Sequence, residues 1–186
     1  MASAVIYALQ TVSGNQPKIS RIIEEAGQDP TTVGLLGVPC QVAADGGIQV
    51  WDGATVTQGI AGFTKEAFSD LATTGVPKTQ SFGSVPYESD AVNIARGAPF
   101  NDGRIGFEAS VSDSVFFGQV GPSQTTAATD VGVQYGMTQD TDNHWYVDKT
   151  KTAGGSVVVV VVALDYNDTV RGVHFQVLPA AQQATA

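Results

Sequence analysis

Residues 156–164 read Ser-Val-Val-Val-Val-Val-Val-Ala-Leu and form the most hydrophobic stretch of the chain. Six consecutive valines favour a β-strand, because side chains branched at Cβ pack well on a pleated surface. The run shows no alternation of apolar and polar residues, so we expect both faces of this strand to be covered. It is too short to cross a membrane as a helix. It therefore predicts either the central strand of the core or part of a subunit interface, since an exposed run of this kind would aggregate.

Short apolar stretches recur on both sides of this run, spaced by about ten residues with turn residues between them. The predicted strands lie within residues 2–12, 33–44, 48–51, 55–63, 104–111, 114–120, 131–138, 144–150 and 169–178. Asp45-Gly46-Gly47 and Asp52-Gly53 predict tight turns, because glycine adopts a positive φ without steric cost. The pattern predicts a mainly β protein, an antiparallel β-sandwich or barrel of jelly-roll type.

Two segments interrupt the strand pattern with helical spacing. Ile19, Ile22 and Ile23 are placed as on one face of a helix, which predicts a short helix over residues 17–26. A second short helix is expected over residues 65–72. The chain is therefore expected to contain one or two short helices beside its strands.

The middle of the chain, residues 63–103, is rich in Gly, Pro, Ser and Thr and predicts a long irregular loop. We divide the chain into an N-terminal strand and helix, residues 1–32, and a β-domain, residues 33–186. The alanine- and glutamine-rich tail, residues 179–186, is expected to fray. The loop carries three aromatic residues, which either pack on a neighbouring subunit or pin the loop to its own domain: Phe82, Tyr87 and Phe100.

The charge of the chain excludes some partners. Eighteen acidic and nine basic residues give a net charge of −9, and the cations are scattered along the sequence. Binding to nucleic acid needs a basic stripe that displaces counterions from phosphates, and an anionic membrane surface also attracts clustered cations. We therefore expect neither partner. The apolar N-terminal run lacks the positively charged region of a secretory signal, which predicts a protein made in the cytoplasm without obvious export.

Residues for catalysis are scarce. The chain has two histidines, His144 and His174, and one cysteine, Cys40, which lies among apolar residues and predicts a small buried side chain. The sequence contains neither a G-x-S-x-G nucleophile motif nor a glycine-rich phosphate loop. We expect no enzyme, no catalytic residues and no cofactor.

Two further patterns are compatible either with a binding site or with ordinary structural roles. Residues 140–144, Asp-Thr-Asp-Asn-His, begin like a calcium loop but lack its glycine and closing glutamate, so we expect a hairpin tip and no metal. Trp51, Trp145 and Tyr146 are ordinary strand residues or, if they share one exposed face, a platform for stacking sugars.

Two sets of segments resemble structural proteins of tailed bacteriophages. Residues 37–53, from Gly-Val-Pro-Cys to Val-Trp-Asp-Gly, and residues 58–63, Gln-Gly-Ile-Ala-Gly-Phe, resemble the β-barrel part of head decoration (cement) proteins. Residues 121–136, 144–150 and 173–179 are similar to phage structural proteins encoded near capsid genes.

This resemblance implies a virion protein that binds the outside of a capsid and stabilises contacts between major capsid subunits. It implies the major capsid protein as partner and a closed oligomer, a homotrimer first and a dimer next. Two alternatives remain open from the residues: another virion component, such as a tail or connector protein, and a carbohydrate-binding β-module.

Overall fold

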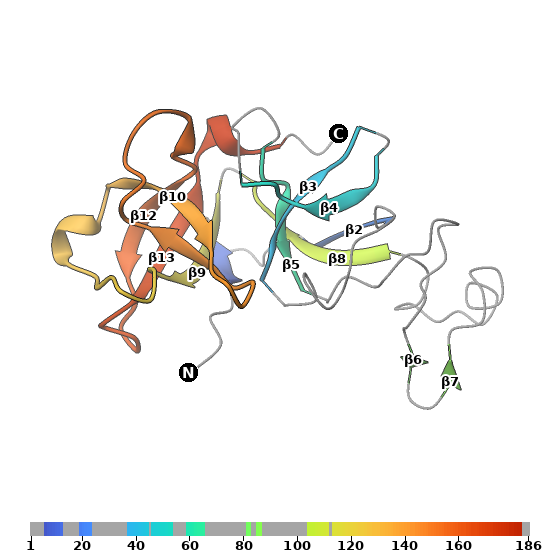
Figure 1. The fold of residues 1–186 in the computed structure, drawn as a ribbon, viewed down its shortest axis with the longest axis horizontal. Helices are drawn as coiled ribbons and strands as arrows, with labels where there is room; N and C mark the ends of the chain where they lie inside the picture. The colour runs from blue at the N-terminus through green and yellow to red at the C-terminus, as the bar shows by residue number, and fades with distance from the viewer. Residues whose placement is uncertain are drawn as a thin grey trace.

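The computed structural model describes residues 6–12, 19–23, 37–44, 46–53, 59–65, 81–82, 85–86, 104–111 and 113–183. Over these residues the chain is mainly β, with two antiparallel sheets and no α-helix (Figure 1). A separate two-stranded ladder joins β6 (Ser81–Phe82) to β7 (Val85–Pro86). The predicted mainly β, sandwich-like fold class is confirmed, while the jelly-roll connectivity stays a prediction.

The larger sheet has six strands in the order β1-β9-β13-β12-β10-β11. Figure 1 shows most of it at one end of the molecule. Two short 3-10 turns, η1 (Ala128–Asp130) and η2 (Gly154–Ser156), lie in its connections. Its strands are β1 (Tyr7–Thr11), β9 (Ser114–Gln119), β10 (Gln134–Gln139), β11 (Trp145–Asp148), β12 (Val159–Leu164) and β13 (Gly172–Val177).

The smaller sheet has five strands in the order β2-β8-β5-β3-β4. Its strands are β2 (Ile19–Ile23), β3 (Pro39–Val42), β4 (Ile48–Val50), β5 (Gly62–Thr64) and β8 (Arg104–Ala109). The turn at Gly46 (φ 91°) closes the predicted hairpin between β3 and β4. The turn at Gly53 (φ 72°) does not join paired strands, because β5 pairs with β3 and β8 and not with β4.

One hydrophobic core joins the two sheets. Phe63 of β5 packs against both Phe116 of β9 and Phe175 of β13, with ring centroids 4.6 and 5.8 Å from its own. All three side chains are completely buried. Burying an aromatic side chain of this size contributes about 1.5–3 kcal/mol before entropy is considered, so this trio fixes how the sheets pack.

The predicted helix over residues 17–26 is wrong, because residues Ile19–Ile23 form β2 and pair with β8. A helix of two or three turns is marginal unless it docks. Isoleucine is branched at Cβ and favours a strand wherever a neighbouring strand offers hydrogen bonds. The second predicted helix, residues 65–72, lies outside the described residues beyond Lys65, as does most of the predicted loop.

The N-terminal segment contributes a strand to each sheet, since β1 pairs with β9 and β2 pairs with β8 of the same chain. Glu108 of β8 is buried and accepts a hydrogen bond from the backbone N–H of Ala8 in β1, which ties the two sheets together. Lys65 lies 2.8 Å from the other carboxylate oxygen of Glu108. The division at residue 32 stays a prediction.

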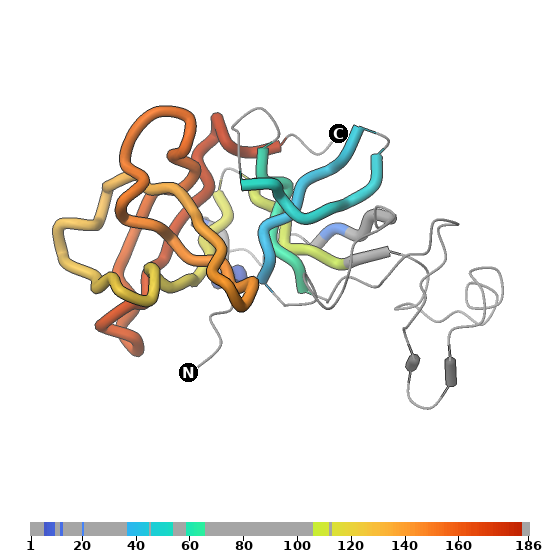
Figure 2. The backbone as a smooth tube through the Cα atoms, viewed as in Figure 1, coloured from blue at the N-terminus to red at the C-terminus, as the bar shows by residue number. Residues whose placement is uncertain are grey.

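The C-terminal tail does not fray over its described part. Residues Pro179–Ala181 form the 3-10 turn η3, and Ala181 is 1% exposed. The backbone N–H of Ile60 donates to the carbonyl of Ala181 at 2.7 Å, and Figure 2 shows the red C-terminal segment reaching the smaller sheet. A Cβ on Gly59 would lie 2.6 Å from the backbone of Gln182, so this contact requires glycine.

The valine run is an interior strand whose two faces differ. As predicted, β12 lies inside its sheet, between β13 and β10. Val159 and Val161 are completely buried, whereas Val160 is half-buried and Val162 is 37% exposed. The prediction that both faces are covered is therefore wrong for the single chain. A bulge between Val161 and Ala163 shifts the pairing with β13 at the exposed position.

Candidate functional site

The aromatic residues predicted to make subunit contacts are not placed by the structure. Tyr87 and Phe100 lie outside the described residues. Of Phe82 only the backbone is described, as the partner of Val85 in the β6–β7 ladder. Their role stays a prediction.

The six-stranded sheet has an apolar surface on its side away from the core. We call it the outer face and define it by Tyr7, Phe117, Val160 and Val162. Tyr7 is 45% exposed and stacks on the half-buried Phe117, with ring centroids 5.0 Å apart. Because directly paired residues share one side of an antiparallel sheet, the register places the Tyr7–Phe117 pair in a row with His174 and Ala163. The outer face thus crosses four strands.

His174 lies on the outer face and is fixed by a carboxylate. Its Nε2 is 2.9 Å from Oδ2 of Asp165, and its ring lies 6.4 Å from that of Phe117. Partial burial by itself would raise the pKa of Asp165, but hydrogen bonds from the backbone N–H groups of Asp168 and Asn167 and from His174 hold it below its usual value. These contacts order the connection between β12 and β13 at the edge of the outer face.

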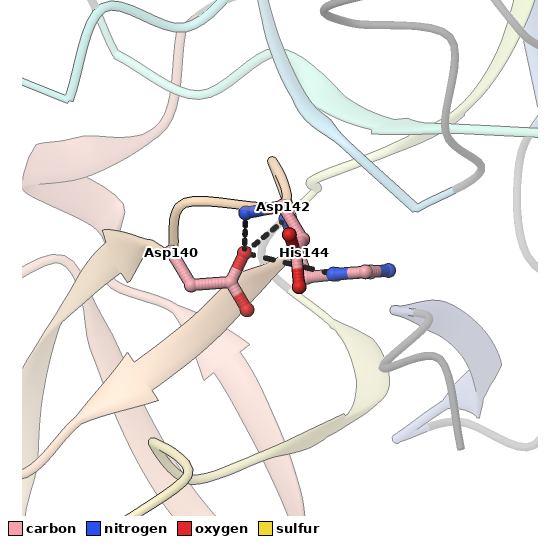
Figure 3. Close-up of side chains that lie close together, drawn as sticks. All are labelled: Asp140, Asp142 and His144. Carbon is pink, nitrogen blue, oxygen red and sulfur yellow. Dashed lines mark hydrogen bonds and ion pairs between the residues drawn. The ribbon is translucent and has the colours of Figure 1, made fainter. Parts of the chain in front are cut away.

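The second histidine lies at the hairpin tip between β10 and β11 (Figure 3). Oδ1 of Asp140 accepts hydrogen bonds at 2.9 Å from the backbone N–H groups of both Asp142 and His144, and Asn143 has a φ of 64°. This is the predicted self-bonded turn. Burial opposes ionisation of Asp140, yet these bonds and one from Tyr146 hold its pKa below the usual value.

The same tip gathers groups that can bind metals. One ligand atom each of Asp140, Asp142 and His144 lies within 4.8 Å of the others. Nδ1 of His144 is 3.6 Å from Oδ1 of Asp140. Two backbone N–H groups already occupy the oxygen of Asp140 that faces this cluster, so the turn accounts for the arrangement.

The predicted sugar platform is not exposed. Trp51, Trp145 and Tyr146 are 3%, 6% and 6% exposed. The two tryptophan rings lie 5.4 Å apart in the core, and Arg171 covers the ring of Tyr146 at 5.3 Å from its centroid. The pair of tryptophans nevertheless lines a pocket of about 460 Å³ together with Asp52, Thr138 and Lys151, among others.

Cys40 is a packing residue, as predicted. It is completely buried, its Sγ lies 3.3 Å from the carbonyl of Gly62, and burial raises the pKa of its thiol. A thiol with a raised pKa is a poor nucleophile, because the thiolate is the reactive form.

The outer face could not be recognised as exposed from the sequence, although a signal for it exists. In Ser-Val-Phe-Phe-Gly-Gln-Val, residues 114–120, consecutive apolar residues place Phe116 and Phe117 on opposite sides of one strand. Together with the valine run, this shows that both sides of the larger sheet are apolar. The sequence does not show which of these two sides is covered by other residues of the same chain.

Within the described ranges, no helix is long and apolar enough to span a membrane. Comparison of the chain with protein-family models, with curated proteins and with solved structures finds no match.

Proposed function

We propose that this chain is a non-enzymatic structural protein of a tailed-phage virion, which binds the outside of the capsid and stabilises contacts between major capsid subunits. The observation that carries the proposal is the outer face, whose Tyr7 and Val162 are 45% and 37% exposed. Monomeric proteins rarely expose contiguous apolar patches larger than a few hundred Å², and patches of that size commonly mark a protein–protein contact.

The packing behind the outer face favours binding to a partner. On the other side of the sheet, the completely buried aromatic trio of Phe63, Phe116 and Phe175 packs it against the smaller sheet. A surface that keeps its shape loses little entropy on binding. Repeated over a symmetric lattice, contacts that are individually weak add up to stable attachment.

The test is the copy number of the chain in purified particles of the phage that encodes it, measured by quantitative mass spectrometry against the major capsid protein. The proposal predicts a ratio of one to one or a simple fraction of it. A few copies per particle would contradict capsid decoration and indicate a tail or connector component. Absence from the particles would contradict a virion role altogether.

We also propose that the chain forms a homotrimer, with a dimer as the next choice, because closed symmetric oligomers match the local symmetry of a capsid lattice. Sedimentation velocity of the free protein measures this directly. A species at three times the 19.3 kDa of the chain is expected. A monomer at all concentrations up to the millimolar range would contradict self-association.

A further inference from the structure

The connection between β9 and β10, residues 120–133, differs in charge from the other connections of the six-stranded sheet. From Ser114 to Gln139 the chain carries one charged residue, Asp130, although 15% of the whole chain is charged. Asp130 is buried, so the exposed residues of this connection are all uncharged. Charged side chains occur in each of the later connections of the same sheet, which are residues 140–144, 149–158 and 165–171.

Apolar side chains of this connection are exposed to solvent. Ala127 and Ala128 are exposed, and Val131 is 47% exposed. Val170 of the β12–β13 connection is 57% exposed and lies beside this segment, because the backbone N–H of Thr126 donates to its carbonyl at 2.8 Å. Figure 1 shows both connections at the end of the molecule away from the smaller sheet. We call this surface the end patch and define it by Ala127, Ala128, Val131 and Val170.

Asp130 orders the backbone of the end patch from its buried side. Its Oδ2 accepts a hydrogen bond at 2.7 Å from the backbone N–H of Ala127, and its Oδ1 accepts one at 2.7 Å from the hydroxyl of Tyr135. Lys149 lies 2.8 Å from Oδ2 and balances the charge of the carboxylate. A surface that is already ordered loses little entropy on binding. The end patch is therefore prepared for a contact.

The charged residues next to Val170 are bound by groups of the same chain. The guanidinium of Arg171 lies 5.3 Å from the centroid of the Tyr146 ring. Oδ2 of Asp168 accepts a hydrogen bond from the side-chain amide of Gln119 at 2.7 Å. Neither charge needs a group from a partner, so an apolar partner surface can cover the end patch without separating these pairs.

The net charge of the chain indicates which partner suits an uncharged surface. The chain carries a net charge of −9, so two copies repel each other wherever their acidic surfaces meet. A basic partner gains from the acidic surfaces and gains nothing from a surface without charge. Copies of this chain therefore approach each other at the end patch with the least repulsion.

We propose that the end patch is a contact surface between copies of this chain in its homo-oligomer. In a closed symmetric oligomer every copy uses the same surfaces, so the patch occurs once in each copy of the assembly. The inference rests on the self-association proposed above and adds the surface that mediates it.

A matched pair of variants tests this surface by sedimentation velocity of the full chain. Ala128→Glu adds a charge at η1 in the end patch, whereas Ala153→Glu adds the same charge beside η2 in the β11–β12 connection, and both alanines are exposed. We expect Ala128→Glu to weaken self-association at least about tenfold, because it brings like charges together in the contact, and Ala153→Glu to assemble as the wild type does. An Ala128→Glu chain that assembles as tightly as the wild type would overturn the proposal, as would equal weakening by Ala153→Glu.

Val170→Glu repeats the test on the neighbouring connection. It should also weaken self-association, and it decides the question if circular dichroism shows that Ala128→Glu does not fold. Wild-type assembly of a folded Val170→Glu chain would then overturn the end patch. A wild-type chain that stays monomeric would instead overturn self-association as a whole, while the copy number in particles tests capsid attachment separately.

Discussion

On the inner side of the six-stranded sheet, Phe116 and Phe175 are completely buried against Phe63 of the smaller sheet. On its outer face, the next residue of β9 is Phe117, which is only half-buried beside the exposed Tyr7. The two sides carry similar side chains, so hydrophobicity alone does not distinguish them. The difference is whether the chain itself supplies a second layer. We infer that the side without one is the side available to a partner.

The largest expected effect comes from the inner side. Phe175→Ala should lower the free energy of unfolding by about 3–5 kcal/mol, because it leaves a cavity in the aromatic trio. Phe117→Ala, on the same sheet, should cost less than about 2 kcal/mol, since it mainly loses its stacking on Tyr7 and partial burial. Urea unfolding followed by tryptophan fluorescence measures both variants. Equal losses would mean that the two sides are covered alike.

Two neighbouring residues of β12 allow a closer comparison of the two sides of the sheet. Val161→Thr places a hydroxyl in the core and should cost about 1–3 kcal/mol. Val162→Thr places the same hydroxyl on the outer face, where water reaches it, and should cost less than about 0.5 kcal/mol. Both substitutions keep the shape and the β-branching, so their difference in denaturation midpoint isolates burial. A Val162→Thr variant as unstable as Val161→Thr would contradict the exposure of the outer face.

We expect the stability of the fold to depend on pH through Asp130, a buried carboxylate beside the core. Tyr135, whose ring lies in the core, donates to Oδ1 of the buried Asp130 at 2.7 Å, and Lys149 lies 2.8 Å from Oδ2. Burial by itself would raise the pKa of Asp130, but these two partners and the backbone N–H of Ala127 hold it below the usual value. Burial, together with the hydrogen bond to Asp130, raises the pKa of Tyr135 to about 12.

A carboxyl whose pKa is lower in the folded than in the unfolded state stabilises the fold above the unfolded pKa of about 3.9, and that contribution is lost as the pH falls through the folded pKa. The unfolding free energy should therefore be level from about pH 7 to 5 and fall below about pH 4. Asp130→Asn should be less stable at neutral pH and should decline less steeply in acid. A decline as steep as that of the wild type would exclude Asp130 as a source of acid sensitivity.

The smallest effect on the fold is a chemical one. Native Cys40 should not react with a thiol reagent at pH 8, because it is completely buried and its pKa is raised, and it should react once the chain is unfolded. A thiol introduced by Val162→Cys should react in the folded protein. The absorbance change with Ellman's reagent counts the accessible thiols, and one reactive thiol in the native wild-type chain would contradict the placement of Cys40.

Most of the strands could be predicted from the sequence, whereas the helix predicted over residues 17–26 is wrong. Alternating or continuous apolar stretches between Gly- and Asp-rich turns located β8 to β13 closely, because the period of side chains in a strand is a local property. The spacing of Ile19, Ile22 and Ile23 fits a helix equally well locally, and only pairing with β8, over eighty residues away in the sequence, decides for a strand.

The outer face and the contact between the two tryptophans could not be predicted for the same reason. The sequence shows that Val161 and Val162 are identical neighbours, but only Val161 belongs to the buried core with Phe63 and Phe175, which come from other parts of the chain. Likewise, Trp51 and Trp145 are adjacent only because the smaller sheet packs against the β10–β11 hairpin. The sequence identified both tryptophans as candidates for stacking sugars, and only the structure shows that their rings are buried.

We propose that the outer face is the surface by which this protein attaches to a capsid. The most direct test is incorporation of Val162→Glu into particles, compared with Tyr166→Glu, which changes a 90% exposed aromatic residue in the β12–β13 connection. Both variants should fold, since both sites are exposed. We predict that Val162→Glu is missing from purified particles while Tyr166→Glu is present at the wild-type copy number. Val162→Glu at the wild-type copy number would contradict the account.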